Sequence, residues 1–197
     1  MAALDKVNNI LDGQPKSNYI PYVLNLRACI LSRIGKTEES LDLVERCLQT
    51  NPTFRELTVN KGWFLFCLAR YDEAEQLLET IPDNDTNRSA LSYKFSNLAR
   101  LHARRGATES ALELVHKAIE LNDENGHGTM YVTLGYVLAA ANETERALEA
   151  VNKAISLDEF DSEAFWLRHK IYQALGHAGD SERDRVEALK NGFVPHI

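Results

Sequence analysis

The sequence predicts an all-α fold, an α-solenoid of about five helix-turn-helix repeats. Three observations carry this prediction. Residues Ala111 to Leu121 and Ala147 to Leu157 are identical at eight of eleven positions, at an offset of 36 residues. Short turns recur at spacings of 34, 37, 36 and 34 residues, centred on Gly35, Ala69, Gly106, Asn142 and Gly176. Apolar residues lie three and four positions apart on both sides of each turn, which indicates amphipathic helices in a stacked repeat.

The turns also predict where the helices begin and end. Gly or Asn at four of the five turn centres permits a left-handed residue after the first helix of each pair. Thr37, Thr108 and Thr144 then qualify as N-caps of the second helices. Polar residues or Pro stop these helices near Asn51-Pro52, Ile81-Pro82, Asn122-Asp123 and Asp158-Glu159. The predicted repeats therefore cover residues 19–52, 54–85, 88–123, 126–159 and 161–192.

Both ends of the chain have the pattern of capping segments. Residues 1–16 include one amphipathic helix, Ala2 to Asp12, which we expect to pack as a half repeat under the first full repeat. The helix from Ser181 to Asn191 is unusually polar, as a solvated terminal helix of a solenoid must be. Residues 193–197 form a short tail. We therefore expect residues 1–197 to form a single repeat domain.

The repeats resemble the tetratricopeptide repeat family, whose pattern is W-x2-L-G-x2-Y followed by A-x3-F, A and P with a period near 34 residues. The fourth repeat is the most similar, with Tyr131, Leu134, Gly135, Leu138, Ala147, Val151 and Ala154. The similarity extends from Tyr19 to Asn191. It implies a right-handed solenoid in which the first helix of each pair lines a concave face.

Several residues depart from the family pattern inside the first helices. Arg27, Lys61 and Arg168 stand where the family has Leu, and their long stems can pack along a helix while the charge reaches water. His102 and His169 occupy positions that pack between helices. We expect both to be core histidines with a hydrogen-bonded ring nitrogen.

Composition excludes several classes of protein. The longest apolar run, Trp63 to Ala69, is too short to span a membrane, so no membrane insertion is expected. Asp5 and Asp12 interrupt the segment where a signal peptide would be apolar. The three cysteines are odd in number and lack metal-binding spacing. These features predict an intracellular, cytoplasmic protein without a metal.

The chain also lacks the motifs of common enzymes and cofactor sites. It contains no GxxxxGK, GxGxxG, HExxH or CxxC motif, and Gly126-His127-Gly128 falls in an inter-repeat loop. Its carboxylates follow helix surfaces and first turns. A net charge of −7 and a pI near 5.4 disfavour nucleic acid as a partner. We expect a protein that is not an enzyme and needs no cofactor.

The first helices carry the candidate partner-binding residues. Counting back from each turn by steps that keep to one helix face selects aromatic and basic side chains in a chain that is acidic overall. Tyr, Trp and Arg are enriched at binding hot spots. A competing interpretation is that Trp63 and Tyr136 pack between neighbouring first helices. The candidate set is Tyr22, Arg33, Asn60, Trp63, Tyr93, Asn97, Arg100, Arg104, Thr133, Tyr136 and Lys170.

The family resemblance also bears on the partner. Asn60 and Asn97 resemble asparagines with which many such repeats hold the main chain of a ligand. The chaperone-docking subfamily clamps a C-terminal carboxylate with Lys and Arg, but other residues stand there in this chain, namely Tyr22, Leu26, Tyr93, Thr129 and Thr133. The predicted partner is an amphipathic or acidic-aromatic segment of a protein, extended or helical, bound by a scaffold, adaptor or co-chaperone. Replacing Asn97 and Arg100 by Ala is expected to remove binding and leave the melting temperature nearly unchanged.

A second hypothesis is structural self-assembly. Incompletely capped end faces of a solenoid could stack into homo-oligomers or filaments. Mass that rises with concentration would favour this hypothesis over the binding module.

Overall fold

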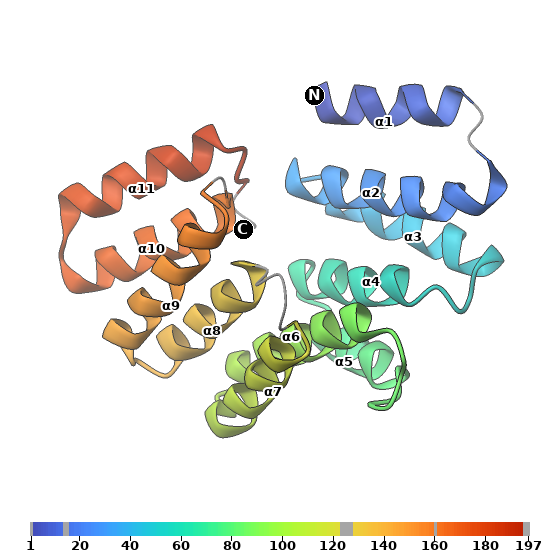
Figure 1. The fold of residues 1–197 in the computed structure, drawn as a ribbon. Coiled ribbons are helices and arrows are strands. Elements are labelled where there is room, and N and C mark those ends of the chain that lie inside the picture. Colours follow the sequence, from blue (N-terminus) through green and yellow to red (C-terminus); the bar gives the residue numbers. More distant parts are fainter. Residues whose placement is uncertain (1, 14–15, 123–127, 160, 195–197) are drawn as a thin grey trace. The chain divides into compact units, whose positions relative to one another are not determined.

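A computed structural model describes residues 2–13, 16–122, 128–159 and 161–194 of the chain. Every regular element in this part is helical, which confirms the predicted all-α fold (Figure 1). The helices are α1 Ala2–Asp12, the short 3-10 helix η1 Ser17–Tyr19, α2 Ile20–Arg33, α3 Thr37–Thr50, α4 Arg55–Cys67, α5 Tyr71–Glu79, α6 Arg88–Arg104, α7 Thr108–Glu120, α8 Gly128–Ala140, α9 Thr144–Leu157, α10 Ser162–Leu175 and α11 Ala178–Lys190.

The helices divide into two compact units. Unit 1 contains α1 to α5 within Met1–Pro82, and unit 2 contains α6 to α11 within Asp83–Phe193. In each unit the two helices that flank a turn pack against each other. The first helices of successive repeats within a unit are also in contact, namely α2 with α4, α6 with α8 and α8 with α10. Pairing of adjacent helices is the arrangement that the sequence predicts. One continuous domain over 1–197 stays a prediction.

All five predicted turn centres adopt the left-handed conformation. The φ angles are 83° at Gly35, 58° at Ala69, 78° at Gly106, 61° at Asn142 and 75° at Gly176. The backbone N–H of the following residue then donates to a carbonyl five residues earlier, as from Lys36 to Leu31 at 2.9 Å. This is the bond pattern that closes a helix at a left-handed residue. The turn chemistry predicted from the sequence is confirmed, and it extends to an alanine.

The predicted N-caps of the second helices are wrong. Thr37, Thr108 and Thr144 are the first helical residues, and the residue before each of them stands at the cap without a side-chain bond. The reason is the tightness of the turn, since the residue after the left-handed one is already fixed by its bond to the preceding helix. Among the described residues, side-chain caps begin two first helices, α6 at Asn87 and α10 at Asp161.

Small residues let the helices of a pair approach closely. A Cβ atom at Gly135 would lie 2.5 Å from Val151 Cγ2, and one at Gly62 would lie 2.7 Å from Leu78 Cδ2. Ala111 and Ala147, at the equivalent position of two second helices, are fully buried. The close contact predicted between first and second helices is therefore present in both units.

Two of the three basic residues that depart from the family pattern make polar contacts, whereas the buried Nε of Arg27 has no hydrogen-bond partner among the described residues. Lys61 pairs with Glu45 at 2.9 Å, and Arg168 holds Asp184 through two bonds of 2.6 and 2.8 Å. Both histidines have the predicted hydrogen-bonded ring nitrogen, since His102 Nδ1 lies 2.8 Å from Ser110 Oγ and His169 Nδ1 lies 2.8 Å from Ser181 Oγ. His169 is buried in the core as predicted, whereas His102 is half-buried.

The terminal helices cap their units unequally. Helix α1 packs on α2 and buries Val7, as predicted for a half repeat. Helix α11 is polar but leaves two apolar side chains, Val186 and Leu189, 51% and 42% exposed. The loop with Gly126 and His127 and the tail residues 195–197 lie outside the described residues. No helix in the described part of the chain has the length and apolar content needed to cross a membrane.

Candidate protein-binding surface

In unit 1, helices α2 and α4 lie side by side and present a joint surface, which we call the first-helix face. It consists of Tyr22, Asn25, Leu26 and Cys29 on α2 and Asn60 and Trp63 on α4. Tyr22 and Leu26 are 57% and 51% exposed. Exposed aromatic and aliphatic side chains of this size, close together, are typical of a surface that a partner covers.

Two asparagine side chains join the helices at the centre of this face. Asn60 Nδ2 donates to Asn25 Oδ1 at 2.8 Å and lies 3.4 Å from Cys29 Sγ. Among the described residues, the Asn25 amide N–H groups and the Asn60 carbonyl oxygen have no further partner. Burial raises the pKa of the Cys29 thiol to about 11, against a weaker effect of Arg33, so the thiol is neutral. The pair therefore offers one donor group and one acceptor, side by side.

Aromatic rings frame the first-helix face. The Tyr22 ring meets Phe54 edge-on at 4.7 Å between centroids. The Trp63 ring stacks on Phe66 at 5.5 Å and is half-buried. Phe66 belongs to the same helix as Trp63, so this contact does not test the competing interpretation, in which Trp63 packs between neighbouring first helices. Arg33 is exposed at the end of α2.

In unit 2, the predicted polar residues are inside the protein. Arg100, Asn97 and Thr133 are 4%, 7% and 0% exposed. Arg100 Nε donates to Thr133 Oγ1 at 3.0 Å, and Arg100 Nη1 donates to Glu163 Oε1 at 2.5 Å. The guanidinium carbon also lies 5.6 Å from the centre of the Tyr136 ring.

The hydroxyl of Thr133 completes this network. It lies 2.8 Å from Ser96 Oγ and donates to the Thr129 carbonyl at 3.1 Å. The network joins the first helices α6, α8 and α10. Because Arg100 is bound inside the unit, its removal must affect stability, which changes our expectation that the melting temperature would stay constant.

The remaining candidates lie toward the edges of the first helices of unit 2. Tyr93 is half-buried on α6, and Arg104 is exposed at the end of that helix. Lys170 Nζ lies 5.5 Å from the Trp166 ring centroid, and Trp166 stacks on Phe193 at 4.8 Å. The structure thus brings Arg100, Thr133 and Tyr136 together and leaves Lys170 in a separate cluster.

Two important partners were not in the predicted set. Asn25 and Glu163 are bonded to predicted residues, but the pairs are separated by 35 and 63 residues in the chain. Helical periodicity places a residue on a face and does not state which side chain of another repeat it meets. A basic and an acidic residue on corresponding faces were the only available signal for Arg100 and Glu163.

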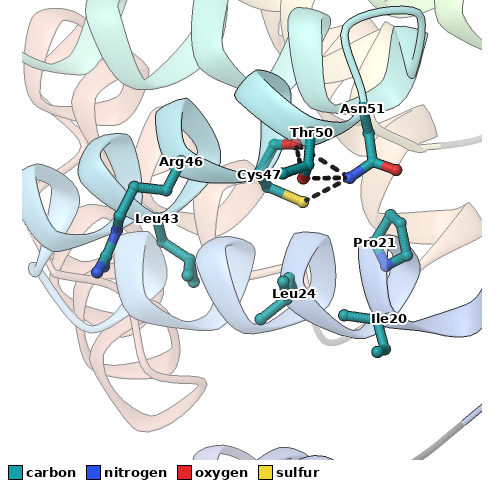
Figure 2. Close-up of a pocket in the computed structure, with 8 residues that line it drawn as sticks. All are labelled: Ile20, Pro21, Leu24, Leu43, Arg46, Cys47, Thr50 and Asn51. Atoms are coloured by element: carbon teal, nitrogen blue, oxygen red, sulfur yellow. Dashed lines mark hydrogen bonds between the residues drawn. The ribbon is translucent and has the colours of Figure 1, made fainter. Parts of the chain in front are cut away.

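Unit 1 also contains a pocket between the start of α2 and the end of α3 (Figure 2). Its volume is about 440 Å³. Asn51 spans one side, with its Nδ2 donating to the Cys47 carbonyl at 3.1 Å and to Thr50 Oγ1 at 2.8 Å. The lining residues are Ile20, Pro21, Leu24, Leu43, Arg46, Cys47, Thr50 and Asn51.

Comparison with solved structures identifies repeat proteins of similar fold. A thermophilic TPR protein of Thermus thermophilus superposes with a TM-score of 0.68 at 20% identity, covering 87% of this chain and 91% of that one. A tetratricopeptide repeat protein of Parabacteroides merdae gives 0.67 at 21% identity, over 96% and 71%. PilW, a type IV pilus biogenesis factor, gives 0.60 at 20% identity, over 94% and 82%. This likeness shows the fold.

Comparison at the level of sequence families is more specific. No curated protein sequence matches the chain. The sequence profile described as the Psidin N-terminal TPR repeats region matches residues 1–159. This match covers most of the chain, including both helices of the clearest repeats. The chain therefore belongs to the family of Psidin N-terminal tetratricopeptide repeat regions.

Proposed function

We propose that the chain is a non-catalytic interaction module that binds a peptide or helical segment of a partner protein. The observation that carries this proposal is the first-helix face of unit 1, where exposed Tyr22 and Leu26 flank the Asn25–Asn60 pair. Tetratricopeptide repeat proteins are generally protein-interaction modules, and the family match supports the same role here. The module would act as a scaffold, an adaptor or a co-chaperone in the cytoplasm.

The chemistry of the face favours a polypeptide ligand. A main-chain amide carries one donor and one acceptor, which the Asn60 carbonyl and the Asn25 amide can satisfy together. Tyr22 and Leu26 would bury apolar side chains on either side of that contact, as hot-spot residues do. Arg33, at the end of the same helix, suits an acidic residue of the partner. An amphipathic or acidic-aromatic segment meets all three requirements.

The buried network of unit 2 has a supporting role in this proposal. Arg100, Thr133 and Glu163 link three first helices through internal bonds. Such a network holds the first helices of unit 2 in place, which lowers the entropy cost of binding at this unit. Among the predicted residues of unit 2, Arg104 and Lys170 are the exposed cations that a partner could reach. A carboxylate-clamp tail is not part of the proposal.

A site-specific cross-link tests the proposal. A photo-reactive phenylalanine analogue at Leu26 is expected to capture a partner protein from a cell lysate, and Asn60→Ala is expected to remove the adduct without changing the melting temperature by more than a few degrees. The same analogue at Glu113, which is exposed on α7 of unit 2, is the matched control. Equal adducts at both positions, or adducts that survive Asn60→Ala, would contradict binding at this face.

Self-association is a second candidate function, favoured by exposed apolar residues on the terminal helices. Val186 and Leu189 lie on α11, and Ile10 lies on α1 with 49% of its surface exposed. Contacts between unlike end faces would give open chains of molecules. Sedimentation velocity over a range of concentrations tests this idea. A single monomeric species that Leu189→Lys does not alter would exclude it.

A further inference from the structure

The pocket of unit 1 can be compared with the same place in other repeats. Leu24 lies eleven residues before its turn at Gly35, and the residues at this position in the last three repeats are Phe95, Tyr131 and Phe165. Thus a leucine stands at the pocket where these repeats of unit 2 have an aromatic ring. In the second repeat Thr58 stands at this position, opposite Ile81, which is larger than the equivalent Cys47 and is fully buried. The first repeat has neither an aromatic ring on its first helix nor a large side chain at Cys47, and the pocket forms there.

The wall of the pocket that α3 supplies can be compared with the second helix of another repeat in the same way. Arg46 and Cys47 lie eleven and twelve residues after their turn, and the equivalent residues of the third repeat are Lys117 and Ala118. In that repeat the Lys117 ammonium lies 5.9 Å from the centre of the Phe95 ring, which is itself buried. A cation over a ring face at this distance is a cation–π contact.

The fourth repeat shows the same filling. Tyr131 packs against a cluster that contains Ala150 and Ala154, the equivalents of Leu43 and Cys47. A ring at this position therefore faces Lys117 of the second helix in repeat three and packs against the core cluster in repeat four. The first repeat has a cation, Arg46, where repeat three has Lys117, and it has an apolar wall on its second helix. It has Leu24 in place of the aromatic ring.

We propose that this pocket binds an aromatic side chain supplied by a partner protein. The ring would lie between Leu24 and Cys47. Arg46 lies beyond Leu43 at one end of the pocket, so its side chain would turn toward the ring to place the guanidinium over the ring face (Figure 2). Arg46 Nε donates to the Asp42 carbonyl at 3.3 Å, and the terminal nitrogens have no partner among the described residues. They are available for the ring and for an acidic neighbour of it.

The size and surroundings of the pocket fit a polypeptide occupant. A cavity of about 150 Å³ holds benzene, so 440 Å³ accommodates a ring together with its attached chain. Ile20 lines the pocket and is 37% exposed, and its neighbour Tyr19 is 56% exposed. This apolar surface extends beyond a single ring, and a peptide segment would cover it. Asn51 is already bonded within α3, so the pocket selects mainly for apolar shape.

This site is separate from the first-helix face and goes beyond the function proposed above. Leu24 is two residues from both Tyr22 and Leu26, which is roughly 200° around a helix of 3.6 residues per turn. The two sites therefore lie on different sides of α2.

Methyl-labelled protein and short peptides test the proposal. An acetylated Gly-Phe-Gly amide is expected to shift the methyl resonances of Ile20, Leu24 and Leu43 saturably, because an aromatic ring displaces nearby resonances by its ring current. The matched peptides carry leucine or cyclohexylalanine in place of phenylalanine. Phenylalanine should bind better than cyclohexylalanine, by about two- to fivefold in Kd, if the Arg46 cation contacts its face.

Two variants make the test specific. Leu24→Phe introduces the ring that the last three repeats have at this position and should abolish peptide binding without lowering the melting temperature. Arg46→Gln should remove the preference for phenylalanine over cyclohexylalanine. This variant keeps the proposal testable if Leu24→Phe does not fold. Asn60→Ala, on the first-helix face, should leave these shifts unchanged, so that failure of one site is distinguished from failure of the other.

The outcomes decide the inference. No saturable shift of the pocket methyls in the wild-type protein, or equal binding of all three peptides, would overturn it. Shifts of the same methyls that grow with protein concentration in the absence of peptide would identify a second copy of the chain as the occupant. That result would also contradict our proposal that a different protein supplies the aromatic side chain.

Discussion

The buried Arg100 network makes a sharp prediction about stability. Replacing Arg100 by Ala removes its bond to Thr133, its ion pair with Glu163 and its contact with the Tyr136 ring. Thr133 keeps Ser96 and the Thr129 carbonyl as partners, so no buried hydroxyl is orphaned. The Glu163 side chain is 35% exposed and can regain hydration. The stability lost in Arg100→Ala is therefore that of the favourable contacts, and no large penalty for a buried, unpaired carboxylate is added to it.

The magnitude follows from these contacts. A hydrogen bond to a charged group contributes about 1.5 kcal/mol or more, the half-hydrated ion pair about 1 kcal/mol, and the contact with the ring about 0.5 kcal/mol. Together they give a loss of about 3 kcal/mol in the free energy of unfolding. For a unit of this length, 1 kcal/mol shifts the melting temperature by about 4 °C. The expected decrease for unit 2 is therefore on the order of 10 °C.

Thermal unfolding followed by circular dichroism measures this effect, and a double-mutant cycle isolates the ion pair. Glu163→Gln alone should cost about 1 kcal/mol, and Arg100→Ala should remove most of that cost in the double variant. Buried ion pairs can be neutral, because desolvation offsets attraction. A fall of less than about 3 °C for Arg100→Ala, with no coupling to Glu163, would refute our reasoning and return Arg100 to the set of candidate binding residues.

Three further predictions concern the helix pairs and their turns. Gly135→Ala should destabilise unit 2 by about 1 kcal/mol, because the clash of the new methyl group with the stiff Val151 side chain outweighs the gain in helix propensity. The control is Gly179→Ala, whose methyl group would meet no atom within 4 Å. In the same thermal melt the control should be neutral or stabilising. Ala69→Gly should stabilise unit 1 by about 1 kcal/mol in urea unfolding, because φ is 58° at this alanine; a loss of stability would contradict this account. Burial, aided by Glu163, raises the pKa of Asp161, so its contribution to stability is present at low pH and is lost as the pH rises through the raised pKa. Asp161→Asn retains an acceptor for the N–H groups of Glu163 and Ala164. The substitution should raise the free energy of unfolding at neutral pH, and this gain in stability should vanish near pH 3. A gain in stability that does not depend on pH would exclude the electrostatic cause.

The sequence by itself determined the helices, their pairing and the turns between them. These features depend on nearby residues, since apolar spacing defines each helix and a left-handed residue closes it. Gly35 and Asn142 could be assigned to turns without knowledge of any distant contact. The small residues at Gly135 and Ala147 likewise identified the surfaces where two helices approach. The N-caps were assigned incorrectly because the bond that fixes Lys36 comes from the preceding helix.

Only the tertiary structure decided which of the residues on a helix face reach the solvent. Asn60 and Arg100 lie on the same predicted face of their first helices, nine and six residues before their turns, yet Asn60 lies at a half-exposed pair and Arg100 is buried. The difference comes from the neighbouring repeats, which supply Asn25 beside one side chain and Thr133 and Glu163 around the other. The pocket at Leu24 has the same origin, because it exists through the relative size of side chains on α2 and α3. Periodicity sets the direction of a side chain, and the packing of distant residues sets its exposure and its partners.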